Sequence, residues 1–386
     1  MTRVFSKPSL SLDQQIAHLR DNGMAIPDEG RARYWLTHVS YYRLSAYWLY
    51  LERPKDEPGP RFNPGTDFET VTALYDFDRV LRRLVMRGTE HVEVALRGSW
   101  AYQLASLDHG HSYLDAGLYS ERKQFHDNLA KLAKDVGESN ETYIDHYRKT
   151  YRAPALPPVW MVAEMMSFGQ LSRWYSSLAD RSLRNRIAVP LGLTETVLVP
   201  FVRHLVDVRN ICAHHGRLWN RGFLICPRLP SKPRDLQLSL DHSAGERPPA
   251  KLYNTITMIN GVMGTVAPES QWACDVKAHI LTHPTGDLAA MGFPEDWEEK
   301  PLWGQDIERA QIYAKRLCAH LWVDSMRRRL QHSKGIHRTV VASPLVAEPA
   351  YRQRRDSVVR HLRKYCLGNT FQHEAVSIRD MAKDFG

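Results

Sequence analysis

The stretch TDFETVTALYDFDRVLRRLVMRGTEHV, residues 66–92, predicts a long helix. Thr66 and Glu69 have the T-x-x-E spacing of a capping box, which opens helices. Apolar side chains then recur at helical spacing, at Val71, Leu74, Leu81, Leu84, Val85 and Val92. Gly88 marks a position where this helix could break. One apolar face of this length predicts a helix that packs against several others.

The sequence on both sides of this stretch has the same helical character. Helices are predicted over residues 12–50 (two, the second with its approach in 26–52), 121–136, from Pro157–Pro158 onward, 194–215 with Gly216 as its stop, 250–282, 304–331 and 350–366. Four prolines and two glycines in 53–66 predict a loop. Alternation typical of strands is weak and no internal repeat is found. The predicted fold class is therefore all-α, with a helical bundle at its core.

Composition is that of a folded protein with a basic carboxyl-terminal part. The 386 residues are 43% hydrophobic, which is enough for a sizeable core and too much for a disordered chain. Of the net charge of +9, residues 304–386 carry +8, from 16 Lys and Arg against 8 Asp and Glu. Such a basic segment is typical of a polyanion-binding region, although arginines that only keep a tail soluble give the same pattern.

Other sequence features restrict the compartment and the chemistry. No apolar run approaches the roughly 18 residues of a membrane span, and residues 1–15 lack the apolar stretch of a secretory signal. The five cysteines are scattered and odd in number, with no CxxC pair, which argues against a disulfide framework or a structural zinc site. We therefore expect a cytoplasmic protein that needs no metal, cofactor or membrane.

A cluster of basic and polar residues ends the predicted helix 194–215, in the stretch VRNICAHHGRLWNR, residues 208–221. His214 lies in the last turn, where the helix dipole favours the imidazolium ion. Arg209 supplies a permanent planar cation and Asn210 a hydrogen-bonding amide. A base, an acid and a cation on the phosphate are the groups that cleave RNA without a metal.

Geometry and chance limit this interpretation. Arg209 and His214 are five residues apart, so they diverge by about 140° around a regular helix. Either the helix ends or distorts there, or a second copy completes the site. The spacing R-x4-H is not specific, because it also occurs at Arg33–His38 and Arg327–His332. Only the pair Arg209–His214 has a polar residue after the arginine and a glycine stop after the helix.

The sequence RNICAHHGRLWNR, residues 209–221, resembles the signature helix end of Abi-like abortive-infection proteins (the AbiD/AbiF type), which belong to the HEPN superfamily. Four further stretches fall in the family's order: HVSYYRLSAYWLYL at 38–51, TEHVEVALR at 89–97, PPVWMVAEMMSFGQLS at 157–172 and MGFPEDWEEKPLW at 291–303. The resemblance covers about residues 10–303. The basic part after it has no counterpart in the family.

This resemblance implies a HEPN-like helical bundle and a metal-independent endoribonuclease toxin of anti-phage defence. It implies Arg209, Asn210 and His214 as catalytic residues, joined across the twofold axis of a homodimer. RNA would be the substrate, and a structured small RNA a potential partner. Acidic support would come from Glu93 or Glu164, unless these only pair with Arg97 or Arg173. RNA-phosphate contacts would come from His215, Arg217 and Arg221.

Several alternatives remain open at this level. A non-catalytic RNA-binding HEPN module would share the same motifs. Trp219 could stack on a base or only anchor the loop, and the aromatic residues Tyr41, Tyr42, Tyr47, Trp48 and Tyr50 could stack on bases or fill the core. Cys212, His214, His215 and Cys226 are unlike a zinc site, because Cys212 falls on the apolar face.

The predicted organisation has four parts. They are an N-terminal helical segment at 1–60, a HEPN-like bundle at 61–225, a further helical part of the Abi-like region at 226–303, and a basic helical extension at 304–386.

Overall fold

The computed structural model describes residues 8–54, 56–107, 110–243 and 250–304, together with Val4 and Ser6. Residues up to Gly304 form one compact unit. The described residues are built from helices, with isolated bridges and no strand, so the predicted all-α class is confirmed. The helices predicted at 304–331 and 350–366 fall beyond Gly304, outside the described residues.

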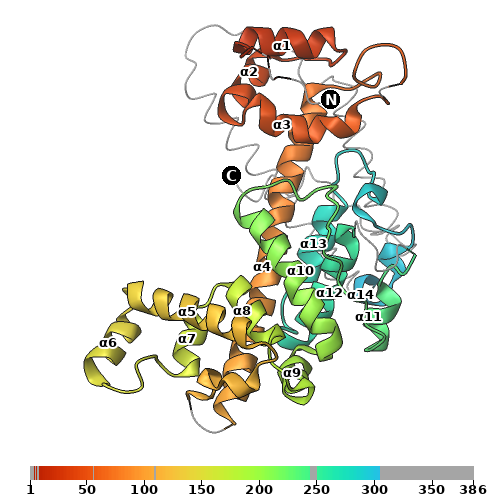
Figure 1. Ribbon diagram of the computed structural model, residues 1–386. Helices are drawn as coiled ribbons and strands as arrows, with labels where there is room; N and C mark the ends of the chain where they lie inside the picture. The colour runs from red at the N-terminus through yellow and green to blue at the C-terminus, as the bar shows by residue number, and fades with distance from the viewer. Residues whose placement is uncertain are drawn as a thin grey trace, which may run out of the picture. The chain divides into compact units, whose positions relative to one another are not determined.

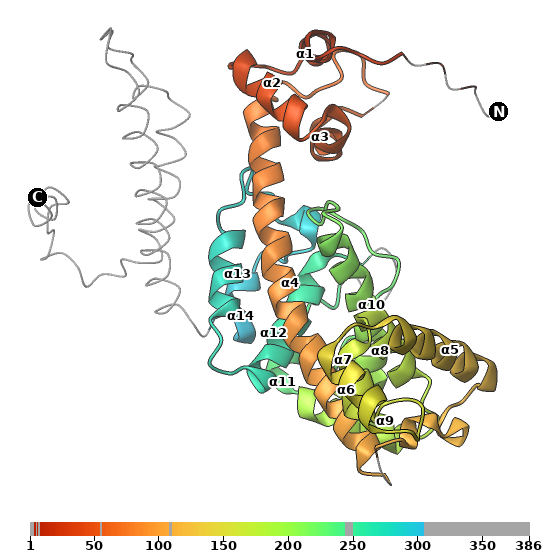
Figure 2. The same ribbon diagram turned by 90° about the vertical axis from the view of Figure 1, so that its left-hand side faces the viewer.

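Helix α4, Phe68–Ala105, is the element against which most others pack. Its 38 residues give a length of about 57 Å at 1.5 Å per residue. It contacts α3 (Tyr41–Trp48), α7 (Val159–Met165), α8 (Phe168–Ser176), α9 (Arg181–Ala188), α10 (Glu195–Ala213), α12 (Leu252–Val266) and α13 (Trp272–Ile280). Figure 1 shows the long helix α4 running along the middle of the unit, and in the view of Figure 2 α10 and α13 lie on opposite sides of it.

Two details of the prediction for α4 were wrong. The N-cap is Asp67, whose carboxylate accepts the Thr70 amide, and not Thr66. The helix also continues unbroken through Gly88. A Cβ at Gly88 would lie 2.7 Å from Ile259 of α12 and from the Trp272 ring of α13. The glycine therefore permits close packing rather than a break.

The N-terminal part has three helices instead of the predicted two. They are α1 (Leu12–Asp21), α2 (Glu29–His38) and α3. The chain turns between α2 and α3 at Ser40, which has a φ of 76° and whose side chain caps α3 by accepting the Arg43 amide. The predicted loop at 53–66 is present and returns the chain to α4.

The middle of the chain follows the prediction with one additional break. Helix α5, Arg122–Glu138, contains the predicted segment 121–136 except for its N-cap, Glu121. The helix expected after Pro158 is divided at Met166–Ser167 into α7 and α8, because Ser167 and Gln170 form a capping box that starts a new helix. Helix α6 spans Thr142–Thr150.

The remaining helices complete the packing around α4. The predicted piece at 250–282 is α12 and α13, and short helical turns at 289–291 and 297–299 precede α14, Pro301–Gly304. Helix α11 spans Arg234–Ser239. Among the described residues no single helix is long and apolar enough to cross a membrane; one pair bent by 70°, Arg181–Leu191 with Glu195–Ala213, passes that test on length and composition alone.

Candidate functional site at the carboxyl end of helix α10

Helix α10 ends in a tight turn at the predicted cluster. Ala213 is its last residue and His214 the C-cap. His215 has a left-handed φ of 57°, and its amide donates to the Cys212 carbonyl at 3.2 Å while the Gly216 amide donates to Ile211 at 2.8 Å. These two bonds form a Schellman motif. The left-handed position is thus His215 and not the expected Gly216, which follows it.

Helix α3 holds this turn in place through two arginines. Arg43 Nη1 donates to the His215 carbonyl at 2.6 Å, and Arg217 Nη1 donates to the Ala46 carbonyl at 2.9 Å. Arg217 is half-buried, and burial lowers the pKa of its guanidinium. At least one N–H group of Arg217 is therefore already hydrogen-bonded within the protein. Through Arg43, the YYRL stretch at 41–44 supports the end of α10.

A buried carboxylate on α4 fixes the segment after the turn. Asp78 accepts the Trp219 amide at 2.6 Å, the Leu218 amide at 3.1 Å and the Tyr47 hydroxyl at 2.6 Å, and it pairs with Arg82. Its side chain is fully buried. Burial raises the pKa of the Asp78 carboxyl, whereas Arg82 and the three hydrogen bonds favour its charged form. Helix α4, helix α3 and the loop after α10 therefore meet at this one residue.

Asp78 and Tyr47 were not predicted as part of the site. The signal in the sequence was a carboxylate on the apolar row formed by Leu74, Leu81 and Val85, with Arg82 one turn further on. An acidic residue on a core face is rarely left unpaired. Its partners Tyr47 and Trp219 lie 31 and 141 residues away, so the sequence alone does not identify them.

Trp219 is an anchor of the loop, which was one of its two predicted roles. Its side chain is fully buried and its indole N–H donates to His283 Nε2 at 2.7 Å. Its ring lies parallel to that of Tyr47, with the centroids 6.2 Å apart. Tyr47 and Trp48 are also core residues, whereas Tyr42 is 88% exposed.

The three residues predicted as catalytic lie at the solvent-facing end of α10. His214 and Asn210 are exposed and Arg209 is partly so. Arg209 Nη1 donates to Asn210 Oδ1 at 3.4 Å, and among the described residues Arg209 makes no ion pair. At the other described R-x4-H spacing, Arg33 is paired with Asp13 and Glu29. Of the two described arginines at this spacing, Arg209 is the one available to bind an anion.

The other predicted site residues differ in their position and exposure. Glu93 pairs with Arg97 at 2.8 Å, and 15 residues of α4 put it about 22 Å from Asp78. Glu164 lies exposed on α7 and, within the described chain, makes no ion pair with Arg173. His215 is exposed, and Arg221 is half-buried with a bond to the Arg217 carbonyl.

The cysteines and histidines weighed above as zinc ligands do not face the same side of the helix end. Cys212 is buried on the core face of α10, whereas His214 and His215 are exposed. Burial raises the pKa of the Cys212 thiol to about 12, which disfavours the thiolate that a metal needs. No group of three or more His, Cys, Asp or Glu within the described chain has the arrangement of a metal site.

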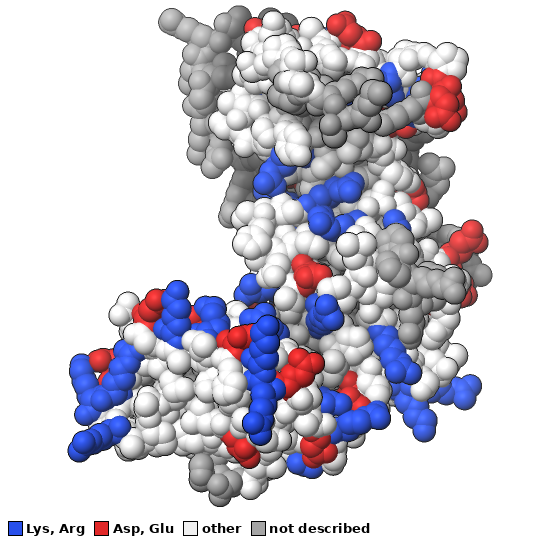
Figure 3. All heavy atoms as spheres, viewed as in Figure 1, with Lys and Arg blue, Asp and Glu red and all other residues white. Residues whose placement is uncertain are grey.

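Basic side chains are spread over the face that carries α10. Figure 3 shows Lys and Arg over α5, α8 and α10, with acidic side chains among them, and a further basic group below α3. A surface of this mixed kind suits a ligand that contacts particular cations rather than a uniform basic patch.

Comparison with known proteins gives one family. Residues 34–220, nearly half of the chain, match the model of the family described as Abi-like protein. This range contains the YYRL stretch of α3, the whole of α4, and α10 with the turn that follows it. The chain matches no curated protein and no solved structure.

Proposed function

We propose that this chain, whose residues 34–220 match the Abi-like protein family, is a metal-independent endoribonuclease of the HEPN type in abortive-infection defence. The observation that carries this proposal is the solvent-facing end of α10, where Arg209, Asn210 and His214 are held by a turn that Arg43 and Asp78 fix in place. Reactive groups on a rigid support are what catalysis by positioning requires.

The proposed reaction transfers the phosphate within the RNA. One imidazole takes the proton of the ribose 2′-hydroxyl, and the 2′-oxygen forms a bond to phosphorus. The bond from phosphorus to the 5′-oxygen breaks, and the imidazolium formed in the first step donates its proton to that oxygen. Arg209 neutralises the charge that builds on the phosphate oxygens. The products are a 2′,3′-cyclic phosphate and a 5′-hydroxyl end.

The arginine and the histidine at one phosphate are proposed to come from two chains. Each chain offers one His214 at this site, and on α10 it diverges from Arg209 by about 140°. A twofold dimer with this helix end at its interface would form two sites, each with Arg209 of one chain and His214 of the other. Dimerisation therefore follows from the chemistry and is part of the proposal.

The experiment is RNA cleavage by the full chain in EDTA, with analysis of the product ends. Wild type is expected to cut and leave cyclic phosphate, and His214→Ala is expected to lose about 10²–10⁴-fold in rate. His146→Ala is the matched control, because His146 is exposed on α6. Binding of RNA with no cleavage by wild type would support the non-catalytic RNA-binding module instead, and 5′-phosphate products or a magnesium requirement would exclude this mechanism.

A further inference from the structure

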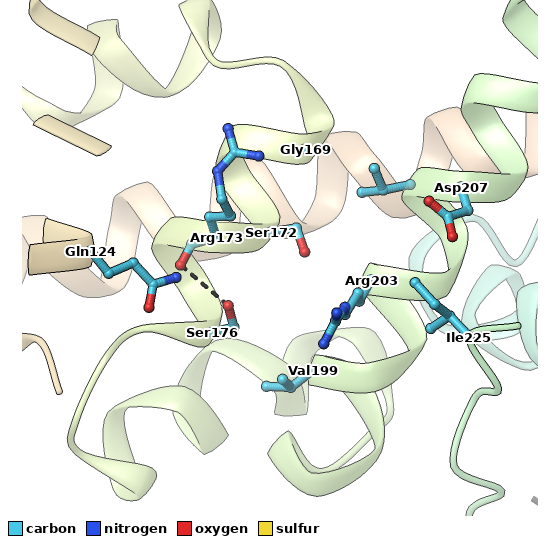
Figure 4. Close-up of a pocket in the computed structure, with 10 residues that line it drawn as sticks. Gln124, Gly169, Ser172, Arg173, Ser176, Val199, Arg203, Asp207 and Ile225 are labelled. Atoms are coloured by element: carbon cyan, nitrogen blue, oxygen red, sulfur yellow. Dashed lines mark hydrogen bonds between the residues drawn. The ribbon is translucent and has the colours of Figure 1, made fainter. Parts of the chain in front are cut away.

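A cleft lies beside α10, away from the proposed catalytic end. The cleft has a volume of about 540 Å³ and is lined by residues of α5, α8 and α10 and by Ile225. Figure 4 shows Arg203 of α10 and the Ser172 and Ser176 hydroxyls of α8 reaching into the space between these helices, with Arg173 at the rim beside Gly169. The polar lining is completed by Gln124 and Asp207.

The charges of this cleft are not neutralised by the protein. Arg173 and Arg203 are both exposed, and within the described part of the chain neither makes an ion pair. Asp207 is the single acidic residue of the lining. Two unpaired guanidinium groups beside hydroxyl and amide donors are suited to a phosphate group.

Helix α10 connects this cleft to the proposed catalytic end. Arg203, Asp207, Asn210 and His214 follow one another at helical spacing on one exposed face. Eleven residues separate Arg203 from His214, which corresponds to about 16 Å along the helix. The carboxylate of Asp207 repels phosphates between these two points, whereas it can accept a hydrogen bond from a ribose hydroxyl.

We propose that this cleft binds the phosphodiester backbone of an RNA strand, a few nucleotides from the linkage that lies at His214. The inference rests on the proposed function for its substrate class, and it adds Arg173, Arg203 and Asp207 as binding residues. One strand along α10 places phosphates at Arg173 and Arg203 and the cleaved linkage at His214, with a ribose at Asp207.

The test measures binding rather than cleavage. The affinity of a fluorescent single-stranded RNA is measured against salt concentration, with His214→Ala as the parent chain so that the RNA stays intact. Arg173→Gln and Arg203→Gln are each expected to weaken binding and to reduce the slope of log affinity against log salt by about 0.7, the value for one lost phosphate contact on a single strand. Arg203→Lys keeps the charge and should keep most of the slope.

The matched control is Arg83→Gln, which removes the same charge from an exposed position on α4. Arg83 lies one turn before Arg87, which pairs with Asp275 of α13, on the side of α4 away from α10. The slope of log affinity against log salt for Arg83→Gln is expected to equal that of the His214→Ala parent. Far-ultraviolet circular dichroism of every variant shows whether the fold is kept.

The outcomes separate this inference from the proposed function. Unchanged slopes for both cleft variants, in a protein whose wild type cuts RNA, overturn the cleft and leave the nuclease. Reduced slopes with no cleavage by wild type support the cleft and overturn the nuclease. If 5′-AMP binds wild type and is lost in Arg203→Gln while the RNA slopes stay unchanged, the cleft is a mononucleotide site and the inference is overturned.

Discussion

Asp78 joins the α10 end to the rest of the molecule through a single side chain. Its partners are the Tyr47 hydroxyl, Arg82 and the amides of Leu218 and Trp219. Removing one member of a buried ion pair leaves the other charge uncompensated, so Asp78→Ala is expected to lower the free energy of unfolding by about 3–5 kcal/mol. Denaturant unfolding of the purified variant measures this loss.

Asp76 is the control for this residue on the same helix. It pairs with Arg79 at the surface, where both side chains are about half exposed. Asp76→Ala should therefore change stability by less than about 1 kcal/mol. Equal losses for the two variants would show that Asp78 does not hold the loop in the way its contacts imply.

His215 holds a backbone conformation that favours glycine. Its φ of 57° is left-handed, which costs a residue with a side chain about 1–2 kcal/mol. His215→Gly should therefore raise the midpoint of thermal unfolding, and it should weaken RNA binding if the imidazole contacts phosphate as predicted. Asn220→Gly, at a φ of 49°, should gain less, because asparagine tolerates this region. A loss of stability in His215→Gly would show that the left-handed backbone at this position is not strained.

The role of a single residue could be predicted when its partners are close to it in the sequence. The position of Arg209, Asn210 and His214 at a helix end could be read from helical spacing. The roles of Arg43 and Asp78 could not, because their partners at the α10 turn are 172 and 140 residues away. A left-handed histidine was also missed, since Gly216 beside it is the residue that ordinarily takes this conformation.

At the scale of one element, α4 contains two glycines with opposite surroundings. A Cβ at Gly88 would lie 2.7 Å from Ile259 and Trp272, whereas nothing lies within 4 Å of one at Gly98. Gly88→Ala is therefore expected to destabilise the protein by about 1–3 kcal/mol through overpacking. Gly98→Ala should stabilise it by about 0.5–1 kcal/mol, because alanine is the better helix former. Unfolding curves of the pair decide this, and two stabilised variants would mean that α12 and α13 do not pack as described.

Helix ends were predicted less well than helix interiors. Periodicity located α4, α5 and α10, because each has an apolar face that lasts for several turns. The breaks at Ser40 and at Met166–Ser167 have no proline or glycine to mark them. They are made by serine caps, whose hydrogen bonds compete with helix continuation only once packing directs the chain to turn.

The described unit contains two buried histidines, His204 and His283, and a half-buried one, His279, that stay neutral. Burial lowers the pKa of His204, His279 and His283 to about 4, from about 6.5 in an unfolded chain. Between these values the unfolded state binds protons that the folded state does not. Stability from these groups is therefore present above pH 6.5 and is lost as the pH falls toward 4, at up to about 1.4 kcal/mol per pH unit for each histidine.

The measurement is the free energy of unfolding between pH 7.5 and 4.5. His204→Gln removes a buried group that hydrogen-bonds Ile225 and Thr255, and it is expected to flatten the pH dependence while lowering stability at pH 7.5. His146→Gln changes an exposed histidine and should leave the slope as in wild type. An unchanged slope in His204→Gln would show that this histidine is protonated in the folded chain.

Assembly decides whether the proposed site is complete. Arg209 and His214 diverge on one helix, so a phosphate bound by both needs Arg209 from one chain and His214 from the other. Arg209→Ala and His214→Ala are each expected to be inactive alone. Mixed in equal amounts with exchange of chains, they form heterodimers in which His214 of the first variant meets Arg209 of the second. One of two sites is then intact in half of the dimers, so about a quarter of wild-type activity should return. Failure to recover any activity, with heterodimers present by mass measurement, would place both residues of a site on the same chain and would require the α10 end to open in the complex with RNA.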